Sequence, residues 1–473
     1  MADDGGRGPV RSGLEAGSGL AVRGVVRRRR TSGLALLPAR APALAALIVS
    51  SGALFAGYDS LLGQAVAYLL NAALLVLLLF LFPPPLAFWR RLAPALALIA
   101  LAALWAAVGH GGVALIPGFA APRPLAPDLF GVEMLGYAGG VAALLGGAVL
   151  GSRPGTVQPF LRWTAGFNLG WIVWGLVLRA GDMQDVFDLW TVTRQGRFTG
   201  TIGNANVTAA VAGAMALIVA GQLHAAIGAG WRRRPVPVLV PAGAFLLFAG
   251  AMIATASRSA LLSLLGLLLL LVLAGQSRGA PGDRLRAFLS SIGVVWIAGA
   301  LTILLLVAGP ILTARFAELD GDAALRLTMW SHYARLAAEA PLYGYGWGGF
   351  ASLNAHSIQD VLLAQKLWNV NSAHNVLLQL TLNGGLPYCG MILAAFALIA
   401  ASLAAHLRRE GWGVPLLAPV LALAQILACA MVDIALDLPA VVTLFLFLGG
   451  LLWGRALRPA ESAGSRPVPD SPA

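Results

Sequence analysis

Long apolar runs without charges recur along the whole chain and limit its fold more than any other feature. A helix needs about 20 residues to cross a bilayer, and the length of each run is close to this value. Composition agrees, because 59% of the 473 residues are hydrophobic and 11% are charged, whereas soluble domains carry about 25% charged residues. One water-soluble core cannot hide that much apolar surface. The sequence therefore predicts an all-α polytopic integral membrane protein and excludes a cytosolic enzyme or a secreted domain.

We predict about twelve transmembrane helices, and the arginines test this number. The predicted spans are 41–57, 61–82, 93–109, 133–150, 160–178, 203–229, 237–254, 259–275, 289–312, 376–404, 415–432 and 438–454. With the N-terminus inside, 23 of the 32 basic residues lie on the cytoplasmic side. Cytoplasmic connections are enriched in Arg and Lys, so this asymmetry predicts that both termini are cytoplasmic.

Five segments follow from this reading. A disordered basic cytoplasmic tail and a large periplasmic loop with an amphipathic helix alternate with the membrane helices, and a second disordered tail ends the chain. Their predicted bounds are 1–40 for the tail, 41–312 for helices one to nine, 313–375 for the loop, 376–455 for helices ten to twelve and 456–473 for the second tail.

The charge and the cysteines exclude other classes of partner. The net charge of +12 comes from short arginine clusters between apolar runs, which is the pattern of topology signals and not of a nucleic-acid surface. Cys389 and Cys429 both lie in apolar runs. The sequence has no HExxH or paired His/Cys spacing, so we expect neither a metal site nor a cofactor.

Arg258 is an arginine on the predicted outer side, where topology disfavours it. It lies in Thr255-Ala-Ser-Arg-Ser259, at the turn between two spans. One interpretation is an arginine that anchors a helix end by reaching toward the interface. The other is an anion site, because a guanidinium grips phosphate oxygens in a bidentate way.

Arg326 lies in the large outer loop and poses the same choice. Asp322 and Pro341 are typical of the start and stop of a helix of about 18 residues. On that helix Arg326, Trp330 and Tyr333 share a face. An amphipathic helix on a membrane surface carries an arginine without any catalytic role, so both interpretations stay open.

Two further places in the loop could contact a ligand. The run Pro341–Phe350 holds four glycines among aromatic residues, Tyr345 included, which can bring backbone close to a ligand and offer ring faces to a sugar. His374 and Asn375 stand at the outer mouth of a long span. A histidine there is either a solvated or capping residue or a base for proton transfer, and no outward carboxylate is placed as suggestively.

Together these segments resemble the O-antigen ligase/polymerase family of bacterial membrane glycosyltransferases. Four stretches carry the resemblance in order: Gly200–Asn206, Ser257–Leu262, Arg326–Trp330 running into Pro341–Gly346, and His374-Asn375 followed by Gly385 and Tyr388. The third stretch reads Leu325-Arg326 where the family commonly has Gly-Arg. The motifs cover about residues 195–405.

The resemblance implies a GT-C-like fold in the bacterial inner membrane, with a metal-independent active site that faces the periplasm. It implies a glycan donor linked to undecaprenyl diphosphate and, for the ligases that the chain most resembles, a lipid A-core acceptor. By position, Arg258 and Arg326 would hold the diphosphate and His374 would be the base. Supporting positions would be Asn206, Trp330, Tyr345 and Asn375.

Two alternatives remain open at this point. A polymerase, or a protein O-glycosylating enzyme of the same family, has the same motifs. A lipid or ion-coupled transporter is the more distant alternative. Transporters carry ionisable groups in mid-membrane or broken helices, whereas the charged residues of this chain lie at the ends of the predicted spans.

Overall fold

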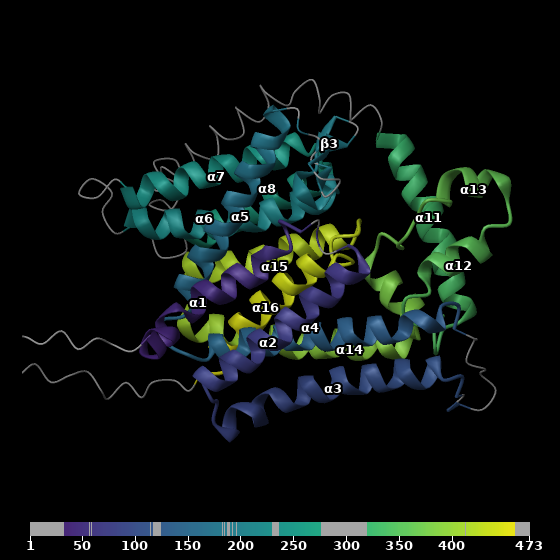
Figure 1. Cartoon of the computed structure of the whole chain (residues 1–473), viewed down its shortest axis with the longest axis horizontal. Coiled ribbons are helices and arrows are strands. Elements are labelled where there is room, and N and C mark those ends of the chain that lie inside the picture. Colours follow the sequence, from purple (N-terminus) through teal and green to yellow (C-terminus); the bar gives the residue numbers. More distant parts are fainter. Residues whose placement is uncertain are drawn as a thin grey trace, which may run out of the picture. The chain divides into compact units, whose positions relative to one another are not determined.

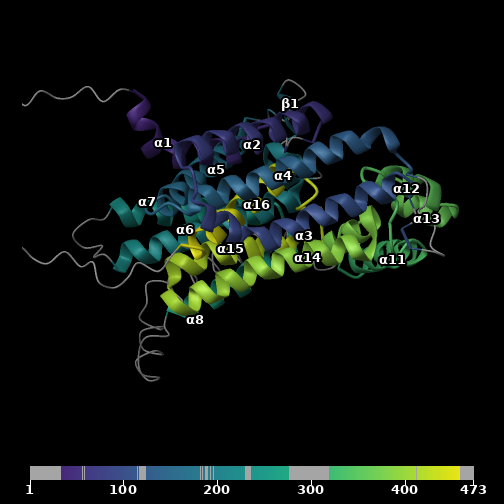
Figure 2. The same cartoon turned by 90° about the horizontal axis from the view of Figure 1, so that it is seen from below.

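The computed structural model describes residues 33–458, except 229–235, 276–318 and short gaps at 56, 58, 114, 117–123, 182, 184, 187–189, 192, 195 and 412. Contacts divide the chain between Leu37 and Pro38 into two units. The second unit holds almost all of the described residues, and its helices are shown in Figures 1 and 2.

Eleven of the predicted spans correspond to helices. These are α1 (Gly33–Ser51), α2 (Leu61–Leu81), α3 (Leu86–His110), α4 (Phe130–Gly151), α5 (Val157–Ala180), α6 (Ala205–Gly228), α7 (Val236–Ala254), α8 (Arg258–Gly275), α14 (Val376–Glu410), α15 (Val414–Ala430) and α16 (Pro439–Ala456). The predicted span 289–312 lies outside the described residues. Among the described residues, eight helices are long and apolar enough to cross a membrane, and α15 is a shorter apolar helix. The prediction of an all-α polytopic membrane protein is confirmed.

Some predicted boundaries were wrong. Helix α1 begins at Gly33, inside the segment that we predicted as a disordered tail, because a single arginine at position 40 does not interrupt a helix. Short strands also occur beside the helices. Strands β1 (Asp185–Val186) and β2 (Trp190–Thr191) pair antiparallel, as do β3 (Thr193–Arg194) and β4 (Arg197–Phe198).

Helices α4 and α16 pack closely against each other. Each helix carries a G-x-x-x-G pair, Gly147 and Gly151 on α4 and Gly450 and Gly454 on α16. A Cβ at any of these four positions would collide with the backbone of the other helix. Small residues at this spacing let helices approach closely where lipid offers no hydrophobic driving force. The pair therefore fixes α16, and with it the turn that precedes it, against the bundle.

Helix α6 lies in the middle of the second half of the bundle. It packs against α7, α8 and α15, and residues 207–219 of α6 are buried on all sides. The start of α6 is consequently held in place from several directions. This start carries the Asn204 and Asn206 side chains described below.

The large loop folds into helices α11 (Leu319–Glu339), α12 (Phe350–Ser357) and α13 (Val361–Leu367), which gather beside the first half of α14 (Figure 1). Their shared core includes Met329, Tyr333, Phe350 and Leu367. Asp322 is not the predicted N-cap, because α11 begins at Leu319 and Asp322 lies inside it. The helix ends before Pro341, as predicted.

Helix α14 runs alongside α3 (Figure 2) and is kinked within the predicted span 376–404. Gly385 has φ 79° and ψ 179°, so the helix is interrupted there. The freed amide of Leu386 donates to Pro341 O at 2.7 Å, and a Cβ at Gly385 would collide with the Leu342 carbonyl. The start of the glycine-rich run Pro341–Phe350 thus packs against the kink, and the hydrogen bond joins the loop to α14.

Candidate active site

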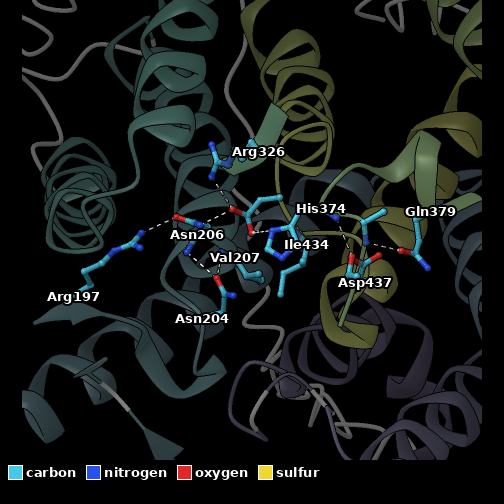
Figure 3. A network of polar contacts seen from close by, with 12 residues as sticks. Arg197, Asn204, Asn206, Val207, Arg326, His374, Gln379, Ile434 and Asp437 are labelled. Carbon is cyan, nitrogen blue, oxygen red and sulfur yellow. Dashed lines mark hydrogen bonds and ion pairs between the residues drawn. The ribbon is translucent and has the colours of Figure 1, made fainter. Parts of the chain in front are cut away.

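A buried carboxylate, Asp433, is contacted by Asn206, Arg326 and His374, whose side chains Figure 3 labels. It belongs to the turn between α15 and α16. Its Oδ2 accepts a hydrogen bond from Asn206 Nδ2 and lies 3.3 Å from Arg326 Nη2. Its Oδ1 lies 3.8 Å from His374 Nδ1. Side chains from α6, α11 and the start of α14 therefore converge on one carboxylate.

Burial separates the roles of these three ionisable side chains. The Asp433 side chain is 3% exposed, whereas those of His374 and Arg326 are 27% and 33% exposed. A ligand can reach the imidazole and the guanidinium but not the carboxylate. Asp433 is thus placed to orient the other two groups, while His374 and Arg326 are placed to contact a substrate.

The start of α6 presents Asn206 to this carboxylate. Asn204 caps the helix, because its Oδ1 accepts from the amides of Asn206 and Val207 at 2.9 and 3.1 Å. A side-chain oxygen that accepts from the second and third amides of a helix satisfies donors that otherwise lack partners. The cap leaves the Asn206 side chain free to bridge Asp433 and Arg197, whose Nη2 donates to Asn206 Oδ1 at 2.7 Å.

Arg197 also connects the network to the turn that carries Arg258. Its Nε donates to Thr255 O at 2.7 Å, and α8 begins three residues later at Arg258, which is half-buried. The Ser257 hydroxyl in this turn is buried and has no hydrogen-bond partner among the described residues. Arg258 and the unsatisfied Ser257 hydroxyl therefore lie in one turn that Arg197 contacts, which is a suitable environment for an anion.

The backbone of His374 is fixed from both sides. The Ser372 hydroxyl accepts from His374 N at 3.2 Å and donates to Asp437 Oδ2. Asn375 caps α14 through Leu377 N and Leu378 N and donates to Met431 O at 2.8 Å. The last contact joins the His374 loop to the turn that carries Asp433.

Two candidate motifs contain strained backbone. His374 has φ 49° and Ala256, in the turn before Arg258, has φ 52°. They are the non-glycine residues with left-handed φ among those that the structure describes. Such conformations cost of order 1–3 kcal/mol and cluster at ligand-binding and catalytic positions. The strain thus marks the same two turns that the sequence motifs single out.

Burial of His374 lowers the pKa of its imidazole below the usual value of 6.5. The Asp433 carboxylate acts in the opposite direction, and the Arg326 guanidinium lowers the pKa further. The net effect keeps the ring neutral at neutral pH. Because Nδ1 faces Asp433, the carboxylate favours the tautomer with the proton on Nδ1, which leaves the lone pair of Nε2 as a proton acceptor.

The structure brings together some of the predicted site residues and not others. Arg326, His374 and Asn206 meet at Asp433. Trp330 and Tyr345 instead pack against the core of the loop helices, where the Tyr345 hydroxyl donates to Leu336 O at 2.9 Å.

The expectation that the glycine-rich run offers free ring faces was also wrong for two of its aromatic residues. Tyr343 and Trp347 are buried, at 3% and 4% exposure, and stack on Trp105 and Tyr137 respectively. The run turns the chain against α3, α4 and α14, so these rings serve packing.

Two network residues escaped the sequence analysis. Asp433 follows an apolar run with no motif around it, and Arg197 lies in a segment that we predicted to be outside and that has no recognisable pattern. A carboxylate at the end of an apolar span needs a partner, and this signal could have paired Asp433 with the arginines predicted to be on the same side. Within the described residues, no three His, Cys, Asp or Glu side chains gather as metal ligands.

Comparison with known families agrees with the motifs. Residues 243–388 match the family model described as O-Antigen ligase. The matched segment contains Arg258, Arg326 and His374 and ends at Tyr388. The match supports the O-antigen ligase family, which the sequence motifs predicted. No curated protein matches the chain in sequence.

Proposed function

We propose that the protein is an O-antigen ligase that transfers a glycan from undecaprenyl diphosphate to a hydroxyl of lipid A-core. The family supports ligase- or polymerase-type chemistry on glycan and lipid substrates in a membrane. The single observation that carries the proposal is the convergence of Arg326 and His374 on Asp433, with the Arg258 turn connected through Arg197.

The arginines would hold the diphosphate of the donor. Three of them, Arg197, Arg258 and Arg326, belong to the network or to the turn attached to it, against one buried carboxylate, Asp433. This excess of positive charge suits a diphosphate, which guanidinium groups bind by paired hydrogen bonds. Fixed cations aimed at the leaving group stabilise the charge that develops on it, so the proposed reaction needs no divalent metal.

His374 would act as the general base. Its Nε2 takes the proton from the acceptor hydroxyl while the oxygen attacks the anomeric carbon of the donor sugar. The bond from that carbon to the diphosphate oxygen breaks, and undecaprenyl diphosphate leaves with both electrons of that bond. The proton then passes from the imidazole to solvent. A positioned base of this kind contributes typically 10²–10⁴-fold to the rate.

The site would face the periplasm of a bacterium with an inner membrane. The support is the arginine asymmetry, since 23 of the 32 basic residues fall in the segments assigned to the cytoplasmic side. Donor and acceptor are both lipids, so a site at the end of membrane helices can receive them from the bilayer.

A deletion strain tests the proposal. Without a ligase, lipopolysaccharide on a gel should lose all O-chain while glycans linked to undecaprenyl diphosphate accumulate. Core that keeps one repeat unit would instead identify a polymerase, and an unchanged gel would reject both. Restoration of the pattern by the wild-type chain, but not by an Arg326→Ala chain, completes the test.

A further inference from the structure

A cavity of about 450 Å³ lies next to the His374 loop. Helices α2, α4, α14 and α16 line it, together with Trp347 and the turn that precedes α16. Ligand pockets typically measure about 300–1,000 Å³ and combine apolar walls with a few placed polar groups. This cavity matches that description, with Leu144 and Leu446 at its apolar part and Glu133 and Asp437 among its polar residues.

The charges on the two sides of His374 have opposite sign. Figure 3 shows Arg197 and Arg326 on one side of the imidazole and Asp437 with Gln379 on the other. Among the described residues, the lining of the cavity on the second side includes Asp437 and Glu133 and no arginine or lysine. Both residues line the cavity and keep exposed surface. Because carboxylates repel a diphosphate, the cavity suits a different ligand from the one that the arginines suit.

The polar groups of the cavity suit a neutral, hydroxyl-bearing ligand. Carboxylates accept hydrogen bonds from hydroxyls, and Gln379 and Asn383 add amide groups one helical turn apart on α14. Trp347 also lines the cavity, is 4% exposed, and has an indole N–H without a hydrogen-bond partner in the described part of the chain. A buried donor without a partner is costly, and this one belongs to a residue of the cavity wall. Tyr68 and Phe350 supply aromatic surface of the kind that contacts sugars.

The cavity is connected to the proposed base by a short chain of contacts. Ser372 and Asp437 both line the cavity. The Ser372 hydroxyl donates to Asp437 and accepts from the backbone amide of His374 at 3.2 Å. A ligand that occupies the cavity therefore lies beside the loop that carries the imidazole.

We propose that this cavity binds the neutral sugar of the acceptor and presents its hydroxyl to His374, with Glu133 and Asp437 as the residues that select it. The proposal rests on the proposed function and adds the place and the chemistry of the acceptor. Donor and acceptor would then meet at His374 from opposite sides, the donor held by arginines and the acceptor by carboxylates.

Binding by the full-length protein in lipid nanodiscs tests this division. One probe is the dephosphorylated, radiolabelled oligosaccharide released from lipid A-core, and the other is undecaprenyl diphosphate. Glu133→Gln and Asp437→Asn keep the size of each side chain and remove its charge. Each should weaken oligosaccharide binding about tenfold, the value of one hydrogen bond to a charged group, and leave undecaprenyl diphosphate binding unchanged. Arg326→Ala should weaken undecaprenyl diphosphate binding and leave oligosaccharide binding unchanged. Glu339 is exposed on α11, and Glu339→Gln should change the binding of neither ligand.

Unchanged oligosaccharide binding in both acidic variants would overturn the proposal, as would a wild-type protein that does not bind the oligosaccharide. Loss of undecaprenyl diphosphate binding in the acidic variants, alone or together with oligosaccharide binding, would also overturn it, because the carboxylates would not separate the two ligands. Transfer assays on the same samples distinguish failure of the proposed function from failure of the sugar site. Charge-dependent oligosaccharide binding without any transfer would reject the proposed function and keep the sugar site. Transfer that tolerates both substitutions would reject the sugar site and keep the proposed function.

Discussion

His374 Nδ1 lies 3.8 Å from Asp433 Oδ1, although the two residues belong to different turns separated by all of α14 and α15. This distance exceeds a hydrogen bond but is short enough for the carboxylate to act on the charge of the ring. Asp433 is held in turn by Asn206 and Arg326. A buried acid beside Nδ1 of a histidine supports the proposal that His374 is the base, because acids in this position orient catalytic histidines.

The pH dependence of transfer should report this pair. Because burial lowers the pKa of His374 below 6.5, activity should fall on acidification with a midpoint below pH 6.5. Asp433→Asn removes the negative charge that raises the imidazole pKa, so this midpoint should move to still lower pH. Initial rates of glycan transfer between pH 4.5 and 8 measure both.

Asp433→Asn should also lower the rate of glycan transfer at neutral pH, on the order of 10²-fold, because the imidazole of His374 loses the group that sets its tautomer. Asp360→Asn, at the exposed start of α13, is the matched control and should behave as wild type. An acid limb that does not move in Asp433→Asn would show that the carboxylate is only structural.

Arg326 and Arg258 should require the shape of a guanidinium as well as its charge. A point charge cannot reproduce two parallel hydrogen bonds to phosphate oxygens, so Arg326→Lys and Arg258→Lys should bind undecaprenyl diphosphate at least about tenfold more weakly, as one lost hydrogen bond to a charged group implies. Arg335→Lys, exposed on α11 and paired with Glu339, is the control. Near-normal affinity in both lysine variants would contradict the diphosphate role.

Gly385 should be intolerant of a side chain. Alanine there must adopt φ near 79° and place its Cβ against the Leu342 carbonyl, so Gly385→Ala should lower the melting temperature in detergent. Gly390→Ala lies in the same helix with nothing near an added Cβ, and alanine favours a helix by about 1 kcal/mol over glycine. That variant should melt at the same or a higher temperature. Equal melting of the two would mean that the kink does not hold the loop.

Cysteine labelling should locate the loop on the outer side of the membrane. Ser331 on α11 and Arg408 at the end of α14 are both exposed and fall on opposite sides in the predicted topology. In whole cells, a membrane-impermeant maleimide should label Ser331→Cys and not Arg408→Cys. The native Cys389 and Cys429 are buried and give the background. The reverse labelling pattern would reject the proposed orientation.

Helix positions could be predicted from the sequence because hydropathy is a local property. The turn at Arg258 falls between α7 and α8 as predicted. The kink at Gly385 escaped prediction because the apolar run continues through it, and only the contact with Pro341 and Leu342 explains it. Boundaries such as the start of α11 are set by packing and not by the nearest capping residue.

The site was predicted in part for the same reason. Arg326 and His374 lie in local motifs, which a sequence displays directly. Asp433 has no motif, and its partners Asn206 and Arg326 lie 227 and 107 residues away. Such a carboxylate becomes recognisable only when the fold brings α6, α11 and the last turn together.

The measurement that tests the account most directly compares His374→Ala with wild type in two assays, glycan transfer and binding of undecaprenyl diphosphate. His356→Ala is the control, because His356 is exposed and its Nδ1 contacts only Ser352 O, at 2.7 Å, among the described contacts. We predict that His374→Ala inserts and binds the donor lipid as wild type does, yet transfers 10²–10⁴-fold more slowly, the range for loss of a general base. Near-full transfer by His374→Ala, or a loss of transfer matched by a loss of donor binding, would contradict the assignment of His374 as the base.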